Sequence, residues 1–317
     1  MTAWLLYALI CLIWGSTWLA IKVGLEGVPP FLGAGLRFLI ASSVFFIWNA
    51  LRGGRLRLER DDKICVASAG ILSFTFGYAL VYWAEQHITS GLTAILYSTM
   101  PLMVALLSRF WMQSERITLK KLCGIFIGIA GTLFLFWPQE RMSALQYWAM
   151  AGVLASVVTA AVNLVILKKY SQKSDIFALN AFAMLIGTVL LLGSSFVLEA
   201  GREVSFNRSN VLALIYLALM GSVVTFATYY HLIKVMPATV LSMITLIIPV
   251  VAVLLGWALL HETLELKTWA GMALVLGGSA FALAPSAELR GPGCVRDAAD
   301  REDAPVFLKR NEKFGKM

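Results

Sequence analysis

Ten long apolar stretches dominate this sequence and restrict the folds that it can adopt. Each is about as long as a bilayer is thick, because a helix needs about 20 apolar residues to cross the hydrocarbon core. Their apolar residues run continuously instead of alternating, so they predict helices and not barrel strands. The stretches are 3–21, 31–51, 64–84, 88–108, 122–137, 142–167, 176–198, 209–233, 235–260 and 268–287. The sequence therefore predicts an all-α polytopic membrane protein with ten transmembrane helices.

The composition agrees with a chain immersed in lipid. Charged residues make up only 14% of the 317 residues, and the mean hydropathy is +0.79. Soluble domains carry about 25% charged residues. The first stretch lacks a basic start and a small-residue cleavage site, so we expect it to be a span and not a removable signal. The four cysteines have neither disulfide nor metal-ligand spacing, and we expect no cofactor and no metal.

The net charge of +8 is distributed as a topology signal. Twenty of the 26 Lys and Arg residues follow even-numbered stretches or lie in the C-terminal tail. Basic residues favour the cytoplasmic side of a membrane. This bias predicts a cytoplasmic (inner) membrane protein with both termini in the cytoplasm, which an even number of spans also requires. The same distribution argues against nucleic acid as a partner and makes the lipid bilayer the expected one.

An internal repeat organises the chain. A shift of 148 or 147 residues superposes matching residues in the third to fifth and the eighth to tenth stretches. The matches are Tyr82 with Tyr230, Pro101 with Pro249, Glu115 with Glu262, Gly124 with Gly271 and Gly131 with Gly278. A unit of five helices is odd, so its second copy crosses the membrane in the opposite sense, as in many secondary transporters. We expect inverted five-helix repeats at 1–141 and 142–287, and a disordered cytoplasmic tail at 288–317.

Polar and aromatic residues inside the spans are the candidate substrate contacts. A buried polar group is costly unless it is paired, so each one either bonds a neighbouring helix or faces a wet cavity. Several aromatic and hydroxyl-bearing faces together favour a cavity for a small amphipathic solute. The candidates are Trp14, Ser16, Thr17, Trp18, Tyr78, Tyr82, Tyr97, Asn163 and Tyr229.

Charged residues are rare near the spans. Lys22, Arg37 and Glu85 are expected near the outer mouth, and Arg37 alone lies within a stretch. Arg37 either attracts an anionic group or pairs with Glu26 or Glu85, and we favour pairing. Because no carboxylate lies deep in a span, we favour facilitated or exchange transport over ion-coupled pumping.

Two repeat-related prolines and a set of glycines complete the candidates. Pro101 and Pro249 fall inside spans and are candidates for a paired hinge, with a merely structural kink as the alternative. The glycines of the fifth and tenth stretches suit close helix contacts, either between the two repeats or between two copies in a homodimer.

At these residues the chain resembles the EamA type of the drug/metabolite transporter superfamily, over about residues 4–285. The resemblance is carried by Trp14-Gly15-Ser16-Thr17-Trp18 with Lys22, by Pro29-Pro30, by Arg37-Phe38 and by the repeated Pro, Glu and Gly matches. It implies two inverted five-helix repeats that move small metabolites by alternating access. We expect a secondary transporter for a small amphipathic metabolite, with an amino acid or a derivative as one candidate. Multidrug efflux and a non-transporting scaffold are the alternatives. No catalytic constellation is present in the sequence, so we expect no enzyme.

Overall fold

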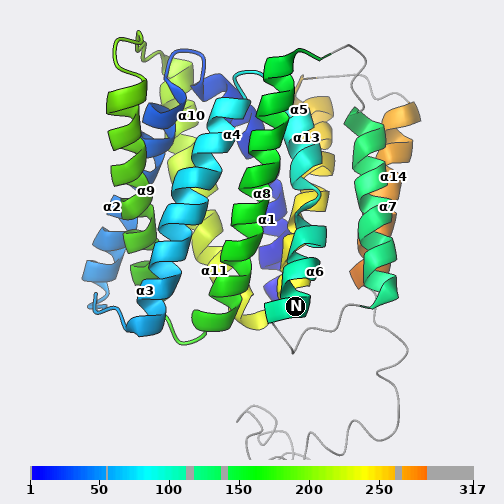
Figure 1. Cartoon of the computed structure of the whole chain (residues 1–317), viewed down its shortest axis with the longest axis horizontal. Helices are drawn as coiled ribbons and strands as arrows, with labels where there is room; N and C mark the ends of the chain where they lie inside the picture. The colour runs from blue at the N-terminus through cyan, green and yellow to red at the C-terminus, as the bar shows by residue number, and fades with distance from the viewer. Residues whose placement is uncertain (1, 55, 112–117, 137–141, 261–265, 284–317) are drawn as a thin grey trace, which may run out of the picture. The chain divides into compact units, whose positions relative to one another are not determined.

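The computed structural model describes residues 2–54, 56–111, 118–136, 142–260 and 266–283. Within these ranges every regular element is helical (Figure 1). The elements are α1 (Thr2–Gly24), α2 (Pro30–Leu51), α3 (Arg60–Ala67), η1 (Ser68–Gly77), α4 (Tyr78–Ala84), α5 (Ser90–Tyr97), α6 (Met100–Trp111), α7 (Leu119–Phe136), α8 (Ala144–Tyr170), α9 (Ile176–Leu198), α10 (Arg208–Ala218), η2 (Leu219–Val224), α11 (Thr225–Val235), α12 (Ala238–Ser242), α13 (Ile244–Leu260) and α14 (Leu266–Leu283). The prediction of an all-helical chain is confirmed.

Seven helical runs in the described part of the chain are long and apolar enough to cross a bilayer. They are α1, α2, α3–η1–α4, a run within α5–α6, α8, α9 and α10–η2–α11. Two further apolar helices, 238–252 and 269–282, are shorter, and α7 has 18 residues. The described residues therefore confirm seven of the expected spans by length, and the count of ten stays a prediction. The expected tail at 288–317 lies outside the described residues.

The two halves share unusual helical features at repeat-related places. A π-helical segment, η1 or η2, interrupts the third helix of each half, between α3 and α4 and between α10 and α11. The next helix is also divided in each half, at Ser98–Thr99 between α5 and α6 and at Met243 between α12 and α13. These interruptions agree with the duplication inferred from residue matches.

The two prolines occupy different helical positions. Pro249 lies inside α13, as expected. Pro101 lies inside the apolar run 92–111, where it is the second residue of α6. The first turn of a helix tolerates proline because its N–H groups have no intrahelical partner. The run 92–111 is interrupted at Ser98–Thr99, directly before Pro101, and the hinge role of Pro101 stays a prediction.

Helices α7 and α14 touch backbone to backbone through glycines. A Cβ added to Gly124 would lie 2.5 Å from the Gly278 oxygen, and one added to Gly131 would lie 3.0 Å from the Gly271 oxygen. Because residue number rises along α7 while it falls along α14, the two helices are antiparallel. The glycines thus join the two halves of one chain, which is one of the two roles expected for them.

Helices α2 and α9 also pack together, one from each half (Figure 1). Gly35 permits this approach, because a Cβ there would lie 2.6 Å from Leu192 Cδ2. Phe46 and Phe182 stack edge to face at 5.2 Å between centroids. Between these paired helices and α1, α8 and α11 lies the main cluster of buried apolar side chains, which encloses the candidate site.

Candidate functional site

A cavity of about 120 Å³ lies among α1, α2, η1–α4, α8, α11 and the divided helices α5–α6 and α12–α13. Eight residues proposed from the sequence line it: Trp14, Thr17, Trp18, Arg37, Tyr78, Tyr97, Asn163 and Tyr229. The rest of the lining was not singled out, including Ser73, Phe226 and Tyr230. Tyr230 could have been predicted from the sequence, since the internal repeat matches it with the candidate Tyr82.

Seven aromatic side chains, from α1, α4, α5 and α11, line the cavity. The Trp14 ring lies 5.3 Å from that of Tyr229 and 5.5 Å from that of Phe226, measured between centroids. The Trp18 ring lies 5.4 Å from that of Tyr97. Edge-to-face and tilted pairs at such distances hold one another in place. The wall is therefore a rigid apolar surface suited to the non-polar part of a small molecule.

Arg37 is fully buried in this wall and its hydrogen-bond partners are all neutral. Its Nε donates to Ser222 Oγ at 2.8 Å, its Nη1 to the Tyr82 hydroxyl at 3.3 Å and its Nη2 to the Gly221 oxygen at 2.9 Å. Its guanidinium carbon lies 4.9 Å from the centroid of the Tyr78 ring, a cation–π contact. The expected pairing of Arg37 with Glu26 or Glu85 is wrong, because the π-helical segment of the other half supplies two of the acceptors.

The π-helical segment η2 explains these acceptors. A π turn leaves the regular hydrogen-bond ladder, and such turns are frequent at functional sites. The Gly221 oxygen accepts from Arg37 and also from Trp14 Nε1 at 3.4 Å. Gly221 has no side chain to obstruct this, whereas a Cβ there would lie 2.9 Å from Thr17 Cγ2. Sequence reasoning missed Gly221 and Ser222, since no pattern in the sequence marks a π turn.

Several polar groups at the cavity have no protein partner. The Trp18 Nε1 and Tyr230 hydroxyl are buried and unpaired in the described structure. The indole N–H can only donate, and the hydroxyl can donate or accept. Asn163 differs, because its amide accepts from Ser68 at 3.1 Å and donates to Ser73 at 3.3 Å. Asn163 therefore joins α8 to the third helix of the first half while it faces the cavity.

Tyr82 and Ser16 support the cavity without lining it. The Tyr82 hydroxyl is an acceptor for Arg37, as described above. The Ser16 hydroxyl lies 2.5 Å from that of Tyr216 and donates to the Ile13 oxygen at 2.7 Å. Tyr97, which does line the cavity, bonds Ser156 through its hydroxyl. Tyr82 and Ser16 thus connect helices, and their contact with a bound molecule stays a prediction.

Lys22 and Glu85 meet at one end of the bundle. Lys22 Nζ donates to the main-chain oxygen of Glu85 at 2.8 Å. The Glu85 side chain itself is fully buried, and both its carboxyl oxygens lack a partner in the described structure. Burial raises the pKa of Glu85 from 4.5 to about 8, although the charge of Lys22 acts in the opposite direction. Glu85 is therefore predominantly protonated at neutral pH.

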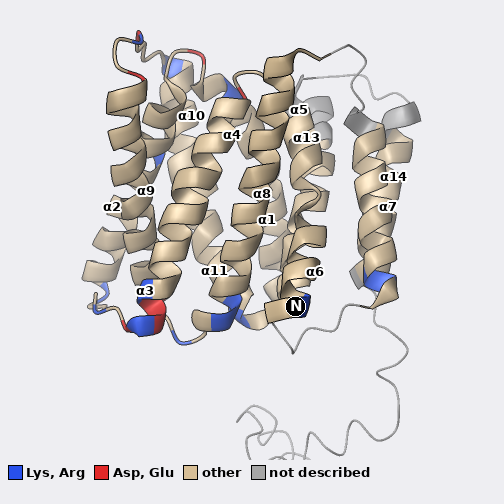
Figure 2. Cartoon of the chain, viewed as in Figure 1, with Lys and Arg blue, Asp and Glu red and all other residues tan. Residues whose placement is uncertain are grey.

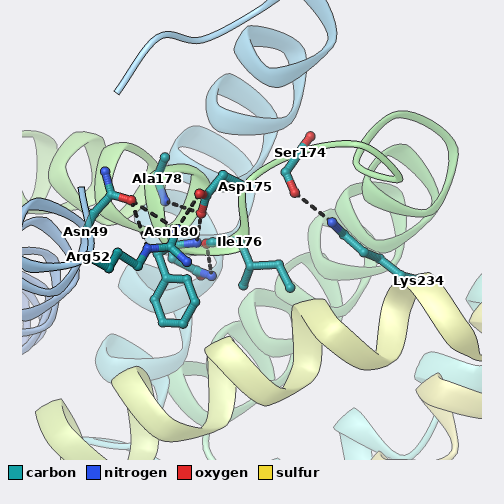
Figure 3. A network of polar contacts seen from close by, with 9 residues as sticks. Asn49, Arg52, Ser174, Asp175, Ile176, Ala178, Asn180 and Lys234 are labelled. Carbon is teal, nitrogen blue, oxygen red and sulfur yellow. Dashed lines mark hydrogen bonds and ion pairs between the residues drawn. The ribbon is translucent and has the colours of Figure 1, made fainter. Parts of the chain in front are cut away.

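A second polar network connects the two halves where the C-terminal end of α2 meets the N-terminal end of α9 (Figure 3). Arg52 at the end of α2 forms an ion pair with Asp175, which caps α9. Arg52 also donates to Asn49 Oδ1 at 3.0 Å, and Lys234 Nζ donates to the Ser174 oxygen at 2.6 Å. Partial burial acts to raise the pKa of Asp175, but hydrogen bonds from Arg52 and from the backbone of α9 outweigh it and lower that pKa.

Acidic and metal-binding side chains do not gather at the cavity. Among the described residues, no group of three or more His, Cys, Asp or Glu side chains is placed to hold a metal ion. The polar and aromatic lining residues present indoles, phenols, hydroxyls, one amide and one guanidinium. This chemistry suits reversible binding of a small organic molecule.

The chain is similar in sequence to a known family of transporters and to several of its members. The model of the EamA-like transporter family matches residues 1–137 and again 147–284. The protein named "Uncharacterized transporter YoaV" of Bacillus subtilis (strain 168) is 30% identical over 275 residues, covering 85% of this chain and 92% of YoaV. "Uncharacterized inner membrane transporter YedA" of Escherichia coli (strain K12) is 32% identical over 269 residues, covering 84% and 85% of the two chains.

A solved crystal structure has the same fold. It superposes with a TM-score of 0.77 at 20% sequence identity and covers 92% of this chain and 99% of its own. The apolar helices, the duplicated halves and the interior cavity define a polytopic membrane protein of the transporter class. The chain belongs to the EamA-like transporter family, with one EamA domain in each half.

Proposed function

We propose that the protein is a secondary transporter that moves a small amphipathic metabolite across the cytoplasmic membrane by alternating access. The main support for this proposal is that helices of both halves line one cavity. The first half contributes α1, α2 and α4, and the second half contributes α8, α11 and α13. A site between repeats is reached from either side when the repeats rock against each other. An amino acid or a derivative is one candidate cargo.

The inverted arrangement of two five-helix repeats is part of this proposal. The antiparallel contact of α7 with α14, at repeat-related glycines, supports it. The π-helical segments and the divided helices at matching places support the same duplication. We propose repeats at 1–141 and 142–287, a cytoplasmic tail at 288–317, and Pro101 and Pro249 as flexible points beside the divided helices.

We also propose that the protein lies in the inner membrane, with both termini on the cytoplasmic side. The E. coli relative YedA is named an inner membrane transporter, which supports the same location here. Lys and Arg residues gather at the end of the bundle where α3 begins and α8 ends (Figure 2). By the positive-inside rule we propose that this end is cytoplasmic, and the distribution of basic residues along the sequence supports a cytoplasmic location for both termini.

Cysteine accessibility tests the transport cavity directly. In a background without the four native cysteines, the Asn163→Cys variant should react with a small charged methanethiosulfonate from either side of sealed vesicles. Ala161→Cys is the matched control, because Ala161 is fully buried two residues away and does not line the cavity. Absence of labelling of the Asn163→Cys variant from both sides would overturn the proposal and favour a non-transporting scaffold.

A further inference from the structure

The charge of Arg37 is not balanced by any acidic group of the described cavity lining. Among the described residues that line the cavity, Arg37 alone is charged at neutral pH. Its hydrogen-bond partners are a hydroxyl, two phenols and a main-chain carbonyl, all neutral. On insertion scales a charge at the bilayer centre costs about 2.5–3.5 kcal/mol, so cationic side chains are usually paired there. A bound anion would supply the missing counter-charge.

The guanidinium also has unused donor capacity. It carries five N–H groups. Bonds to Ser222, Tyr82 and Gly221, together with a side-chain hydrogen bond to Tyr78, use four of them. A free guanidinium N–H and its positive charge suit a carboxylate oxygen, which forms a charge-assisted hydrogen bond. This capacity lies at a side chain that already faces the cavity.

Other groups of the wall add donors and an apolar surface. Trp18 Nε1 and the Tyr230 hydroxyl belong to lining residues, are buried and lack a partner in the described structure. The rings of Trp14 and Tyr229 form an apolar surface of the same cavity. The site thus combines a cation, spare donors and an aromatic wall, the complement of an anion that carries a non-polar group.

We propose that Arg37 binds the carboxylate of a small organic acid, whose non-polar part lies against Trp14, Trp18 and Tyr229. This rests on the proposed function and names the substrate class of that cavity. A cationic solute would meet the unbalanced charge of Arg37 at short range, so lipophilic cations are rejected. The inference thus separates an organic-acid carrier from a multidrug efflux protein for cations.

Matched probes that differ only in charge test this. Binding of 3-phenylpropionate, 3-phenylpropanamide and 3-phenylpropylamine to the purified protein is measured by quenching of tryptophan fluorescence, and the shorter butyrate, butyramide and butylamine are measured in parallel. In at least one series the carboxylate should bind about tenfold or more tightly than its amide, because the amide has no negative charge to pair with the guanidinium and only one acceptor oxygen. Equal binding of carboxylate and amide in both series, or no carboxylate binding, overturns the proposal.

Variants of Arg37 assign the effect to this residue. Arg37→Gln should abolish the preference for carboxylate, and Arg37→Lys should retain part of it, because lysine keeps the charge without the planar fork. Arg57→Gln, at an exposed loop arginine, is the control and should change nothing. The preference in the unaltered protein is decisive even if Arg37→Gln does not fold.

The two proposals fail in distinguishable ways. Labelling of the Asn163→Cys variant together with equal binding of acid and amide would overturn the substrate class alone. Absence of labelling of that variant from both sides would overturn transport itself, whatever the binding preference.

Discussion

Arg37 on α2 donates from Nη2 to the Gly221 oxygen of η2 at 2.9 Å, and this bond crosses between the two EamA domains. The donor comes from a regular helix and the acceptor from a π-helical segment, so the contact depends on a local departure from α geometry. It places the only charge of the described cavity lining at the boundary between the halves. The contact therefore links the site to the packing of the two halves.

Removing the Ser222 hydroxyl should lower the stability of the protein, because it removes one hydrogen bond between η2 and Arg37. Ser222→Ala deletes the acceptor of Arg37 Nε, and a hydrogen bond to a charged group contributes about 1.5–3 kcal/mol. We expect the thermal midpoint of the purified protein to fall by a few degrees. Ser43→Ala is the control, since the exposed Ser43 donates within its own helix, to Leu39. Equal midpoints for the two variants would contradict the role of Ser222.

Two adjacent glycines on α14 should respond oppositely to alanine. A Cβ at Gly278 would lie 2.7 Å from the Gly124 oxygen, so Gly278→Ala must push α7 away, and overpacking of this kind costs about 1–3 kcal/mol. A Cβ at Gly277 would meet nothing within 4 Å, and Gly277→Ala should be neutral or slightly stabilising. Thermal melts of both variants check this. A destabilised Gly277→Ala would argue against the described pairing of α7 and α14.

The stability of the protein should depend on the protonation of Glu85. Its pKa is raised from 4.5 to about 8, so the folded state binds this proton more tightly than the unfolded state does. Stability should therefore fall as the pH rises from about 4.5 to about 8 and change little above that range. Glu85→Gln mimics the protonated carboxyl and should flatten this part of the profile. Glu26→Gln, at an exposed carboxylate, is the control, and a profile unchanged by Glu85→Gln would contradict the burial of Glu85.

Asp175 has two roles that two variants should separate. It caps α9 by accepting from the Phe177 and Ala178 amides, and it pairs with Arg52. Asp175→Asn keeps a good cap and loses only a partly exposed ion pair, which contributes at most about 1 kcal/mol. Asp175→Ala also loses the cap, at a cost of about 0.5–2 kcal/mol. Thermal melts at neutral pH should place the native protein highest, the Asn variant next and the Ala variant lowest.

The acid limb of stability provides a further check on Asp175. Its pKa lies below 3.8 in the folded protein, so its contribution is present above about pH 3.8 and is lost as the pH falls through the lowered value. Asp175→Asn should remove that part of the acid dependence. An acid profile identical to that of the native protein would mean that the ion pair with Arg52 contributes nothing.

The helices and the repeat were predictable because both are long patterns. Continuous apolar stretches mark helices in lipid, and matches such as Tyr82 with Tyr230 survive in widely separated positions. Eight of the residues proposed from the sequence line the cavity, since a polar or aromatic side chain within an apolar span is most stable where it faces something other than lipid.

The partners of individual side chains were not predictable in the same way. Arg37 was expected to pair with a carboxylate, because opposite charges are the obvious partners in a sequence. Its actual acceptors include a main-chain oxygen and a serine that a π turn presents. The exact place of an interruption is also set locally: the break near Pro101 falls at Ser98–Thr99, and Pro101 itself lies in the first turn of α6.

The glycine contact between α7 and α14 has a mechanical consequence. Where two backbones touch without intervening side chains, a change of register by one residue, which combines a slide of about 1.5 Å with a rotation of about 100°, would place a side chain such as that of Ile125 against the facing main chain. The register of this pair is therefore fixed, because close-packed atoms leave no room for the displaced side chain. A thinner or thicker bilayer can tilt the pair as a unit, but it cannot shear one helix along the other.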